Sequence, residues 1–336
     1  MRGRTFIRVF WASLAASALL LVLVVRILLM PSWSTRIAAP ALPIPGETYV
    51  SAYRDDEIDH LLFYFDLFGF GDRIRSADML IAGSSHPELA LSAAKIAGAF
   101  VRPDNRPLRV FNMAVGYGES SGFARAVIEA NHAQSSMVVI DMFAPYGDRI
   151  SPFGQAQLKL SVARAYQRVA QTWAVYLRDR LTDALLIRAR FSVAKGLSFE
   201  RAMGRILTRD WQNGDVVELW SPPLGSRYRN PGAETVHPLI LAAPQPRENS
   251  ISPATASFFA ERGITPYAVL VPYPEGDVAA ASASAKAAGI PFIEISSWLL
   301  EYYDHDHVSA TGREIATGRF IEGLTKLLTE PDARSR

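Results

Sequence analysis

Short apolar runs alternate with amphipathic stretches in two parts of the chain. The runs that are short enough for strands lie at 79–82, 110–111, 137–142, 267–271 and 292–295. Helical patterns follow them, at 88–99, at 120–130, from 151 onward, at 277–288 and at 311–328. Short apolar strands that alternate with helices are typical of a parallel sheet covered on both faces. Because crossovers between parallel strands are right-handed, the pattern predicts an α/β fold, a doubly wound three-layer sandwich.

A long insertion, at 151–250, separates the third strand from the fourth. Apolar side chains at helical spacing mark its first part, namely Leu158, Val162, Tyr166, Val169, Trp173, Leu177, Leu181 and Leu185. We interpret them as the packing stripe of a helix. The basic residues between Lys159 and Lys195 indicate either a solvated helix face or a surface for anionic lipid or an acidic polymer. From Trp211 to Pro246 the chain is proline-rich and typical of an irregular, lid-like loop.

A long uncharged stretch, VFWASLAASALLLVLVV, lies near the start of the chain at 9–25. With its neighbours it reaches the ~20 residues that a helix needs to cross a bilayer. Three arginines precede it, Arg2, Arg4 and Arg8, and they predict a cytoplasmic N-terminus. The alternative is a cleaved signal peptide, with small residues at 38–41, although the run exceeds the usual ~7–15-residue signal core. We expect a single-pass anchor in the inner (cytoplasmic) membrane and a periplasmic remainder.

These patterns divide the chain into five parts. They are a cytoplasmic N-terminus and transmembrane anchor at 1–33, a Pro- and Ala-rich linker at 34–57, the first half of the α/β domain at 58–150, the insertion at 151–250, and the second half of the domain at 251–330. A formal net charge of only +2 gives no reason to expect a nucleic-acid partner. The chain has no cysteine, which excludes disulfides, thiol nucleophiles and thiolate metal sites.

Polar motifs follow the first and last predicted strands, at the sheet edge where α/β folds place their sites. Gly83-Ser84-Ser85-His86 follows the first strand. A serine at such a strand-to-helix turn has its hydroxyl close to free backbone amides, which suits a nucleophile, although a helix cap is the alternative. Asp304 and His307 follow the last strand, and their spacing lets the carboxylate orient the imidazole toward a serine.

Two further features of this edge bear on the chemistry. After the second strand, Asn112 precedes Gly116 and Gly118, whose backbone amides can approach a reacting carbonyl. The cluster Asp304-His305-Asp306-His307 also offers metal ligands, for which His86 is the nearby candidate that would extend the set. A metal site therefore stays open as an alternative to a triad.

The three motifs, in this order, resemble those of the SGNH, or GDSL-like, hydrolases. The first block of that family is Gly-x-Ser after a strand, which Gly83-Ser84-Ser85 matches, and the last is Asp-x-x-His, which Asp304 and His307 match. The resemblance implies an SGNH/flavodoxin-like fold, with Ser85 as nucleophile, His307 as general base and Asp304 as its orienting group. It further implies that Asn112 and Gly116 or Gly118 line the oxyanion hole and bind substrate.

The third block departs from the family pattern. The family has an asparagine after the third strand, whereas this chain has Asp141 there. An oxyanion hole without that donor is weaker by a few kcal/mol unless another group completes it.

With its predicted anchor, the chain also resembles a narrower group, the exported SGNH-like partners of membrane-bound O-acyltransferases. We therefore expect a membrane-anchored extracytoplasmic serine acyltransferase or esterase that O-acetylates or deacylates a cell-envelope polysaccharide. Its partners would be the membrane, an acyl-ester or polysaccharide substrate and a multi-span O-acyltransferase, and we expect no cofactor and no metal. The alternative function is a non-catalytic scaffold or carbohydrate-binding subunit with the same fold.

Overall fold

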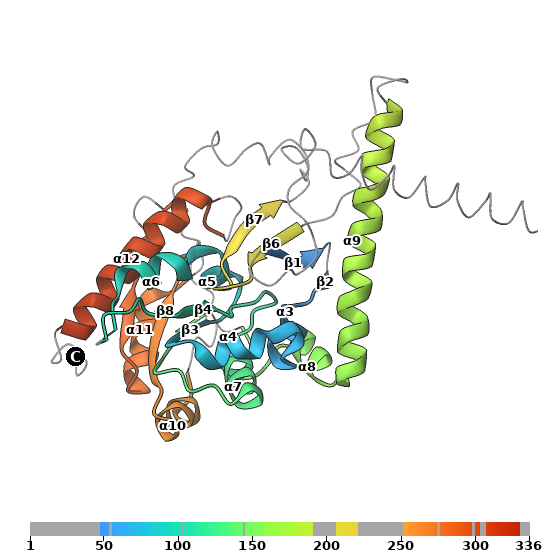
Figure 1. Ribbon diagram of the computed structural model, residues 1–336. Coiled ribbons are helices and arrows are strands. Elements are labelled where there is room, and N and C mark those ends of the chain that lie inside the picture. The colour runs from blue at the N-terminus through green and yellow to red at the C-terminus, as the bar shows by residue number, and fades with distance from the viewer. Residues whose placement is uncertain are drawn as a thin grey trace, which may run out of the picture. The chain divides into compact units, whose positions relative to one another are not determined.

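The chain is α/β in its computed structural model (Figure 1). The structure describes residues 48–53, 56–102, 104–143, 145–190, 206–220, 251–273, 276–297, 300–302 and 307–329. Two compact units are present. The first, Leu42–Tyr176 with Ser198–Arg336, contains both β-sheets, and the second, Met1–Ala41 with Leu177–Leu197, contains the last part of helix α9 (Val162–Arg190).

The central sheet is fully parallel. Its strands are β3 (Met79–Ala82), β4 (Val110–Asn112), β5 (Met137–Asp141), β8 (Thr265–Leu270) and β9 (Phe292–Glu294). They lie in the order β4-β3-β5-β8-β9. The five predicted strands are therefore confirmed, each within two residues of its expected bounds. The strand order reverses between β3 and β5, and doubly wound sheets bind ligands outside the carboxyl ends of the strands at such a switch point.

Helices pack against both faces of this sheet. They are α3 (Asp59–Tyr64), α4 (Phe70–Ser76), α5 (Ser85–Ala90), α6 (Ala93–Ala99), α7 (Ser121–Asn131), α10 (Pro253–Glu261), α11 (Val278–Ala287) and α12 (Ala310–Thr329). On one face α6 and α12 lie side by side (Figure 1), and Ile96 and Phe320 share a core with Ile81 of β3. On the other face the ring of Phe111 in β4 contacts Phe63 of α3, with ring centroids 5.6 Å apart.

A second, antiparallel sheet was not expected from the sequence. It consists of β1 (Thr48–Tyr53), β2 (Asp56–Glu57), β6 (Ile206–Asp210) and β7 (Val216–Trp220), in the order β2-β1-β6-β7. The predicted linker at 34–57 thus contains two strands, and the predicted irregular loop contains β7. Strand β1 pairs with β6 across more than 150 residues of chain. Such long-range pairing leaves no local period, and the almost completely buried β1 shows no alternation of exposed and buried positions.

The packing stripe predicted in the insertion is partly correct. Val169 and Trp173 of α9 are buried, and the Trp173 indole Nε1 donates to the Val50 carbonyl over 3.0 Å. Val162, Tyr166 and Leu177, however, are 52%, 44% and 42% exposed. Val162 and Tyr166 lie near the start of the helix, before the stretch that packs against β1. The side chains of Leu181 and Leu185 lie outside the part of the helix that the structure describes. A short helix, α8 (Pro152–Leu158), and a 3₁₀ turn, η1 (Leu67–Gly69), complete the described elements.

The predicted membrane anchor lies outside the described residues. Within the described ranges no helix is long and apolar enough to cross a bilayer. The anchor and the localisation that depends on it therefore stay predictions.

Candidate active site at the carboxyl edge of β3

The turn after β3 brings Ser84 and Ser85 to the sheet edge. Gly83 has a φ of +150°, and a Cβ at this position would lie 2.2 Å from the Cβ of Asp141, so the turn requires glycine. Ser84 caps helix α5, with its Oγ accepting the His86 amide over 3.1 Å. Ser84 is completely buried, whereas Ser85, the first residue of the helix, is partly exposed. Ser84 therefore has a structural role in the turn, whereas Ser85 is accessible to a substrate.

Ser85 and His307 meet as the sequence predicts. The Ser85 Oγ lies 2.7 Å from the His307 Nε2, although the two residues are 222 positions apart. His307 stands three residues before α12, in the segment that follows β9. The turns after the first and last parallel strands therefore come together at one edge. Asp304, the predicted third member of the triad, lies outside the described residues, as do His305 and Asp306.

Asp141, at the end of β5, bonds to the turn that carries the serines. Its Oδ2 accepts the Ser84 hydroxyl over 2.5 Å and the Ser84 amide over 3.3 Å, while Oδ1 accepts the Phe143 amide over 3.1 Å. Asp141 is 1% exposed. Burial raises the pKa of this carboxyl to about 7, and the hydrogen bonds from Ser84 and Phe143 act in the opposite direction. The residue that departs from the SGNH pattern thus holds the neighbour of Ser85 in place.

His86 was considered in the sequence only as a possible metal ligand, yet it lies at the centre of this site. Its Nδ1 is 3.0 Å from the Ser84 Oγ. Its ring contacts those of Phe143 and Tyr273, with centroids 4.4 and 5.0 Å away. It also stacks on the ring of His307 at 5.3 Å and an interplanar angle of 22°. Its position directly after Ser85 was the signal available in the sequence.

The groups expected to bind an oxyanion are arranged differently from the prediction. The Asn112 side chain is fully buried, and its Nδ2 donates to the Leu91 carbonyl over 3.2 Å and to two further carbonyls of α5 over 3.5 Å. Its Oδ1 accepts the Ala114 amide. These bonds give Asn112 a structural role in place of the expected substrate contact. The Gly116 amide donates to the Glu57 Oε1 over 2.9 Å, so an oxyanion would have to displace that carboxylate.

Gly118 remains a candidate from the same segment. Its φ is +68°, and a Cβ on it would lie 2.6 Å from the Pro145 Cγ. The chain between β4 and α7 therefore needs glycine here for two reasons, a left-handed backbone and a close approach. Tyr117, just before it, also has a positive φ of +60° and is 42% exposed.

A buried arginine, Arg209, hydrogen-bonds the segment that follows β4. The Arg209 guanidinium of β6 donates to Asp59 Oδ2 over 2.7 Å, to Glu88 Oε1 over 3.3 Å and to the Ala114 carbonyl over 2.7 Å. It also donates to the carbonyl of Asn112. Burial raises the pKa of Asp59 to about 6, against the opposing effect of Arg209. This role could not be predicted from the sequence, because Arg209 lies inside the insertion.

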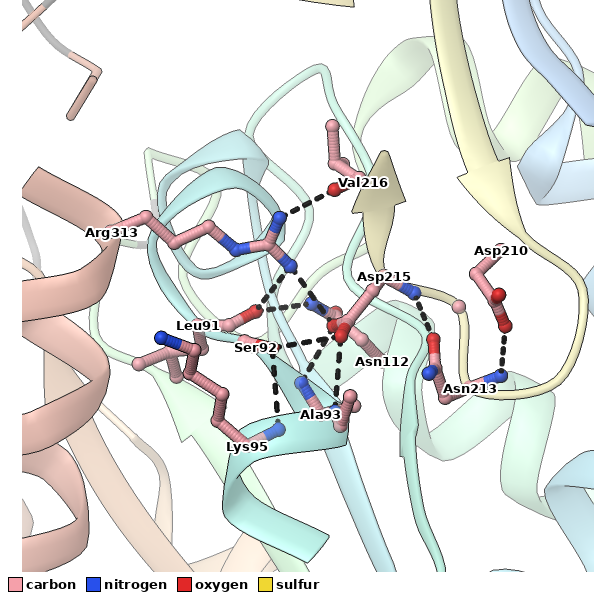
Figure 2. A network of polar contacts seen from close by, with 12 residues as sticks. Leu91, Ser92, Ala93, Lys95, Asn112, Asp210, Asn213, Asp215, Val216 and Arg313 are labelled. Carbon is pink, nitrogen blue, oxygen red and sulfur yellow. Dashed lines mark hydrogen bonds and ion pairs between the residues drawn. The ribbon is translucent and has the colours of Figure 1, made fainter. Parts of the chain in front are cut away.

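The turn between β6 and β7 is tied to the parallel sheet as well (Figure 2). Asp215 accepts the amides of Ala93 and Ala94 at the start of α6, over 2.6 and 3.0 Å, together with the Ser92 hydroxyl over 2.9 Å. Arg313 of α12 pairs with Asp215 at 3.1 Å and donates to the Val216 carbonyl. A carboxylate suits the amides of a helix start. The second sheet is therefore part of the framework of the site.

Two further features of the described structure, an acidic cluster and an open hollow, lie outside the Ser85–His307 pair. Oxygen atoms of Glu57, Asp59 and Glu88 lie within 4.8 Å of one another and are buried. Arg209 bonds two of these carboxylates, so the group is accounted for as an ion-pair cluster. A separate open hollow of about 700 Å³ is lined by residues outside the Ser85 site, namely Phe68, Gly69, Asp72, Arg73, Arg75, Ser76 and Trp211.

Comparison with known proteins gives no match, whether to a protein-family model, to a curated protein or to a solved structure.

Proposed function

We propose that the chain is a serine acyltransferase or esterase of the SGNH type. The observation that carries the proposal is the 2.7 Å contact between the Ser85 Oγ and the His307 Nε2 at the sheet edge. A nucleophile within hydrogen-bonding distance of its base is the arrangement that serine acyl transfer requires. The order of the three sequence motifs, and the strand order with its reversal between β3 and β5, support the SGNH type.

The reaction proceeds through an acyl-enzyme. His307 Nε2 accepts the hydroxyl proton as the Ser85 Oγ attacks the carbonyl carbon of an acyl ester. The backbone amide of Ser85, at the start of α5, donates to the oxyanion. His307 then protonates the leaving alcohol, and the acyl group stays on Ser85. In the second half, His307 takes the proton of a sugar hydroxyl or of water, which attacks the acyl-enzyme and releases Ser85. Asp304 orients His307 throughout.

The predicted anchor is the basis for the proposed location of the active site and for the proposed substrate class. A cytoplasmic N-terminus puts the Ser85 edge outside the cytoplasm, where the substrate would be an envelope polysaccharide. A tethered domain has a high effective concentration toward a membrane partner, which favours transfer from a multi-span O-acyltransferase.

Covalent labelling tests the nucleophile. The full-length protein is treated with a serine-reactive fluorophosphonate, and the labelled peptide is sequenced by mass spectrometry. We expect the label on Ser85 and not on Ser84, which is buried and bonded to Asp141. Ser85→Ala should abolish labelling, and His307→Ala should slow it about 100-fold or more. Ser121→Ala is the matched control, because Ser121, like Ser85, is the first residue of a helix and hydrogen-bonds a side chain from another segment. Labelling that persists in Ser85→Ala would refute the proposal.

A second function is favoured by a specific observation. The Gly116 amide is held by Glu57 and the Asn112 side chain is bonded within the framework, so two expected oxyanion donors are engaged. A scaffold or carbohydrate-binding subunit needs neither donor. The two functions are separated in a deletion strain complemented with Ser85→Ala, in which the acyl content of the envelope polysaccharide is measured. Normal acylation in that strain would favour the scaffold, and loss of acylation would favour the enzyme.

A further inference from the structure

A chain of hydrogen bonds runs from Asp141 through Ser84 to His86, beside the Ser85–His307 pair. The Ser84 Oγ is 2.5 Å from the Asp141 Oδ2, 3.0 Å from the His86 Nδ1 and 3.1 Å from the His86 backbone nitrogen. All three side chains are nearly or completely buried, with exposures of 1%, 0% and 4%. The chain ends on a ring that is stacked on His307.

The donors and acceptors of this chain can be counted. A serine hydroxyl has one proton and two lone pairs. The His86 amide occupies one lone pair, since it caps the helix. When Asp141 is ionised, Ser84 donates to it, and the second lone pair must accept a proton from the His86 Nδ1. When Asp141 is protonated, it donates to Ser84, and the Ser84 hydroxyl must then donate to the His86 Nδ1. Both patterns satisfy the Ser84 hydroxyl, the Asp141 Oδ2 and the His86 Nδ1, and they require opposite tautomers of His86.

We propose that Asp141, Ser84 and His86 form a proton-responsive relay that sets the tautomer of His86 and thereby regulates His307. On acidification a proton binds the His86 Nε2, the Nδ1 proton passes to the Ser84 Oγ, and the Ser84 proton passes to the Asp141 Oδ2. One proton is taken up, and the bonds that form and break are N–H and O–H bonds alone. The product is a neutral Asp141 beside a His86 that carries its proton on Nε2.

The surroundings of the relay suit this exchange. Asp141 is enclosed by the turn after β3 and by Phe143, and burial is the first cause that raises its pKa, to about 7. Among the described residues, the other titratable groups that contact the relay are Tyr273 after β8, whose ring centroid is 5.0 Å from that of His86, and His307 before α12. Ser84 is the hydrogen-bonded neighbour that connects the buried Asp141 carboxyl to the His86 ring.

His307 senses the change because the two imidazoles are stacked. Their centroids are 5.3 Å apart, so a change of tautomer reorients the dipole that His86 presents to the ring of His307. In the pattern with ionised Asp141, His86 has a lone pair on Nε2, and in the other pattern it has an N–H there. The relay therefore changes the electrostatic environment in which His307 acts on Ser85.

The first test reads the tautomer itself and does not depend on catalysis. The full-length protein is labelled with ¹⁵N-histidine, and the ring nitrogens of His86 are assigned with a His86→Gln variant. Protonated and bare ring nitrogens have well-separated ¹⁵N shifts. In the wild type we expect the proton of His86 to move from Nδ1 to Nε2 as the pH falls through about 7. Asp141→Asn should hold it on Nε2 at every pH, because the amide donates to Ser84 as a protonated carboxyl does.

A second variant and a catalytic readout complete the test. Ser84→Ala interrupts the relay and should uncouple His86 from Asp141, and Ser121→Ala, at the matched Ser–Asp pair, should leave the wild-type behaviour. The regulatory consequence rests on the proposed function. We expect the pH profile of Ser85 labelling to lose a component centred near 7 in Asp141→Asn. A His86 tautomer that is the same in the wild type and in Asp141→Asn would overturn the relay. Normal tautomer exchange without any labelling of Ser85 would instead refute the proposed function and leave the relay intact.

Discussion

Arg209 and Asp59 form an ion pair of 2.7 Å in which both side chains are completely buried. Arg209 belongs to the antiparallel sheet, and Asp59 begins the helix that leads toward the parallel sheet. The same guanidinium bonds the carbonyls of Asn112 and Ala114, just after β4. The pair therefore joins the second sheet to the segment that holds Gly116 and Gly118.

Arg209→Met should strongly destabilise the protein. It leaves Asp59 and Glu88 buried without their cation, and breaking a buried pair in this way costs about 3–5 kcal/mol. The measurement is the midpoint of urea-induced unfolding. Arg164→Ala, at an exposed position of α9, is the control and should change stability by less than about 0.5 kcal/mol. Equal midpoints for the two variants would show that the Arg209 ion pairs do not stabilise the folded state.

Gly83→Ala should impair both folding and the site. The new Cβ would lie 2.2 Å from the Asp141 Cβ, and the turn has a φ that alanine rarely adopts. We expect a loss of a few kcal/mol of stability and slower labelling of Ser85. Gly98→Ala, inside α6 with open space around it, should instead gain about 0.5–1 kcal/mol. Opposite signs in thermal unfolding are the expected result, and a harmless Gly83→Ala would contradict the turn geometry.

Asp141 should make stability depend on pH. Its pKa is raised from the usual 3.8 to about 7, so the folded state keeps a proton that the unfolded state has lost. Over the window from about pH 4 to pH 7, the unfolded state binds fewer protons, and stability falls as the pH rises. Above about 7 the loss is complete and constant. Asp141→Asn removes this contribution, so its melting temperature should fall less than that of the wild type between pH 5 and pH 7. Parallel curves would show that Asp141 titrates normally.

Asp215→Ala should separate the β6–β7 turn from α6. Three hydrogen bonds at the start of α6 and the pairing with Arg313 are lost together. An ordinary helix cap is worth about 1 kcal/mol, and Asp277, which bonds one amide of α11, provides that reference. We expect Asp215→Ala to cost about twice as much as Asp277→Ala in urea unfolding. A smaller cost for Asp215→Ala would indicate that the turn is held by other contacts.

Much of the parallel sheet could be predicted, because its strands are local apolar runs. MLIA at 79–82 is β3 without a change of bounds. The rule that parallel strands share a carboxyl edge predicts that Ser85 and His307 lie close together, and they do. The antiparallel sheet could not be predicted in this way. The consecutive residues Tyr49, Val50 and Ser51 of β1 are all fully buried, so the strand shows no alternation of buried and exposed positions. Its partner β6 lies far along the chain.

The polar contacts around the site could not be predicted either, because they join segments that are far apart in the sequence. The spacing of Asn112 and Gly116 suggested oxyanion donors, but spacing does not show that Glu57, from a strand assigned to a linker, reaches the Gly116 amide. The role of Arg209 could likewise not be predicted, since Asp59, Glu88 and the carbonyls of Asn112 and Ala114 come from separate parts of the chain. The sequence shows that His86 follows Ser85, but its stacking on His307 could not be predicted, because that contact depends on the fold.

Trapping the acyl-enzyme tests the central claim most directly. The full-length protein is mixed with an activated acetyl ester, quenched with acid and digested, and the acetylated residue is located by mass spectrometry. The account predicts acetyl on Ser85 and none on Ser84, abolished in Ser85→Ala and reduced about 100-fold or more in His307→Ala. An enzyme that turns over the ester without acetyl on Ser85, or whose acetylation is unchanged in His307→Ala, would contradict it.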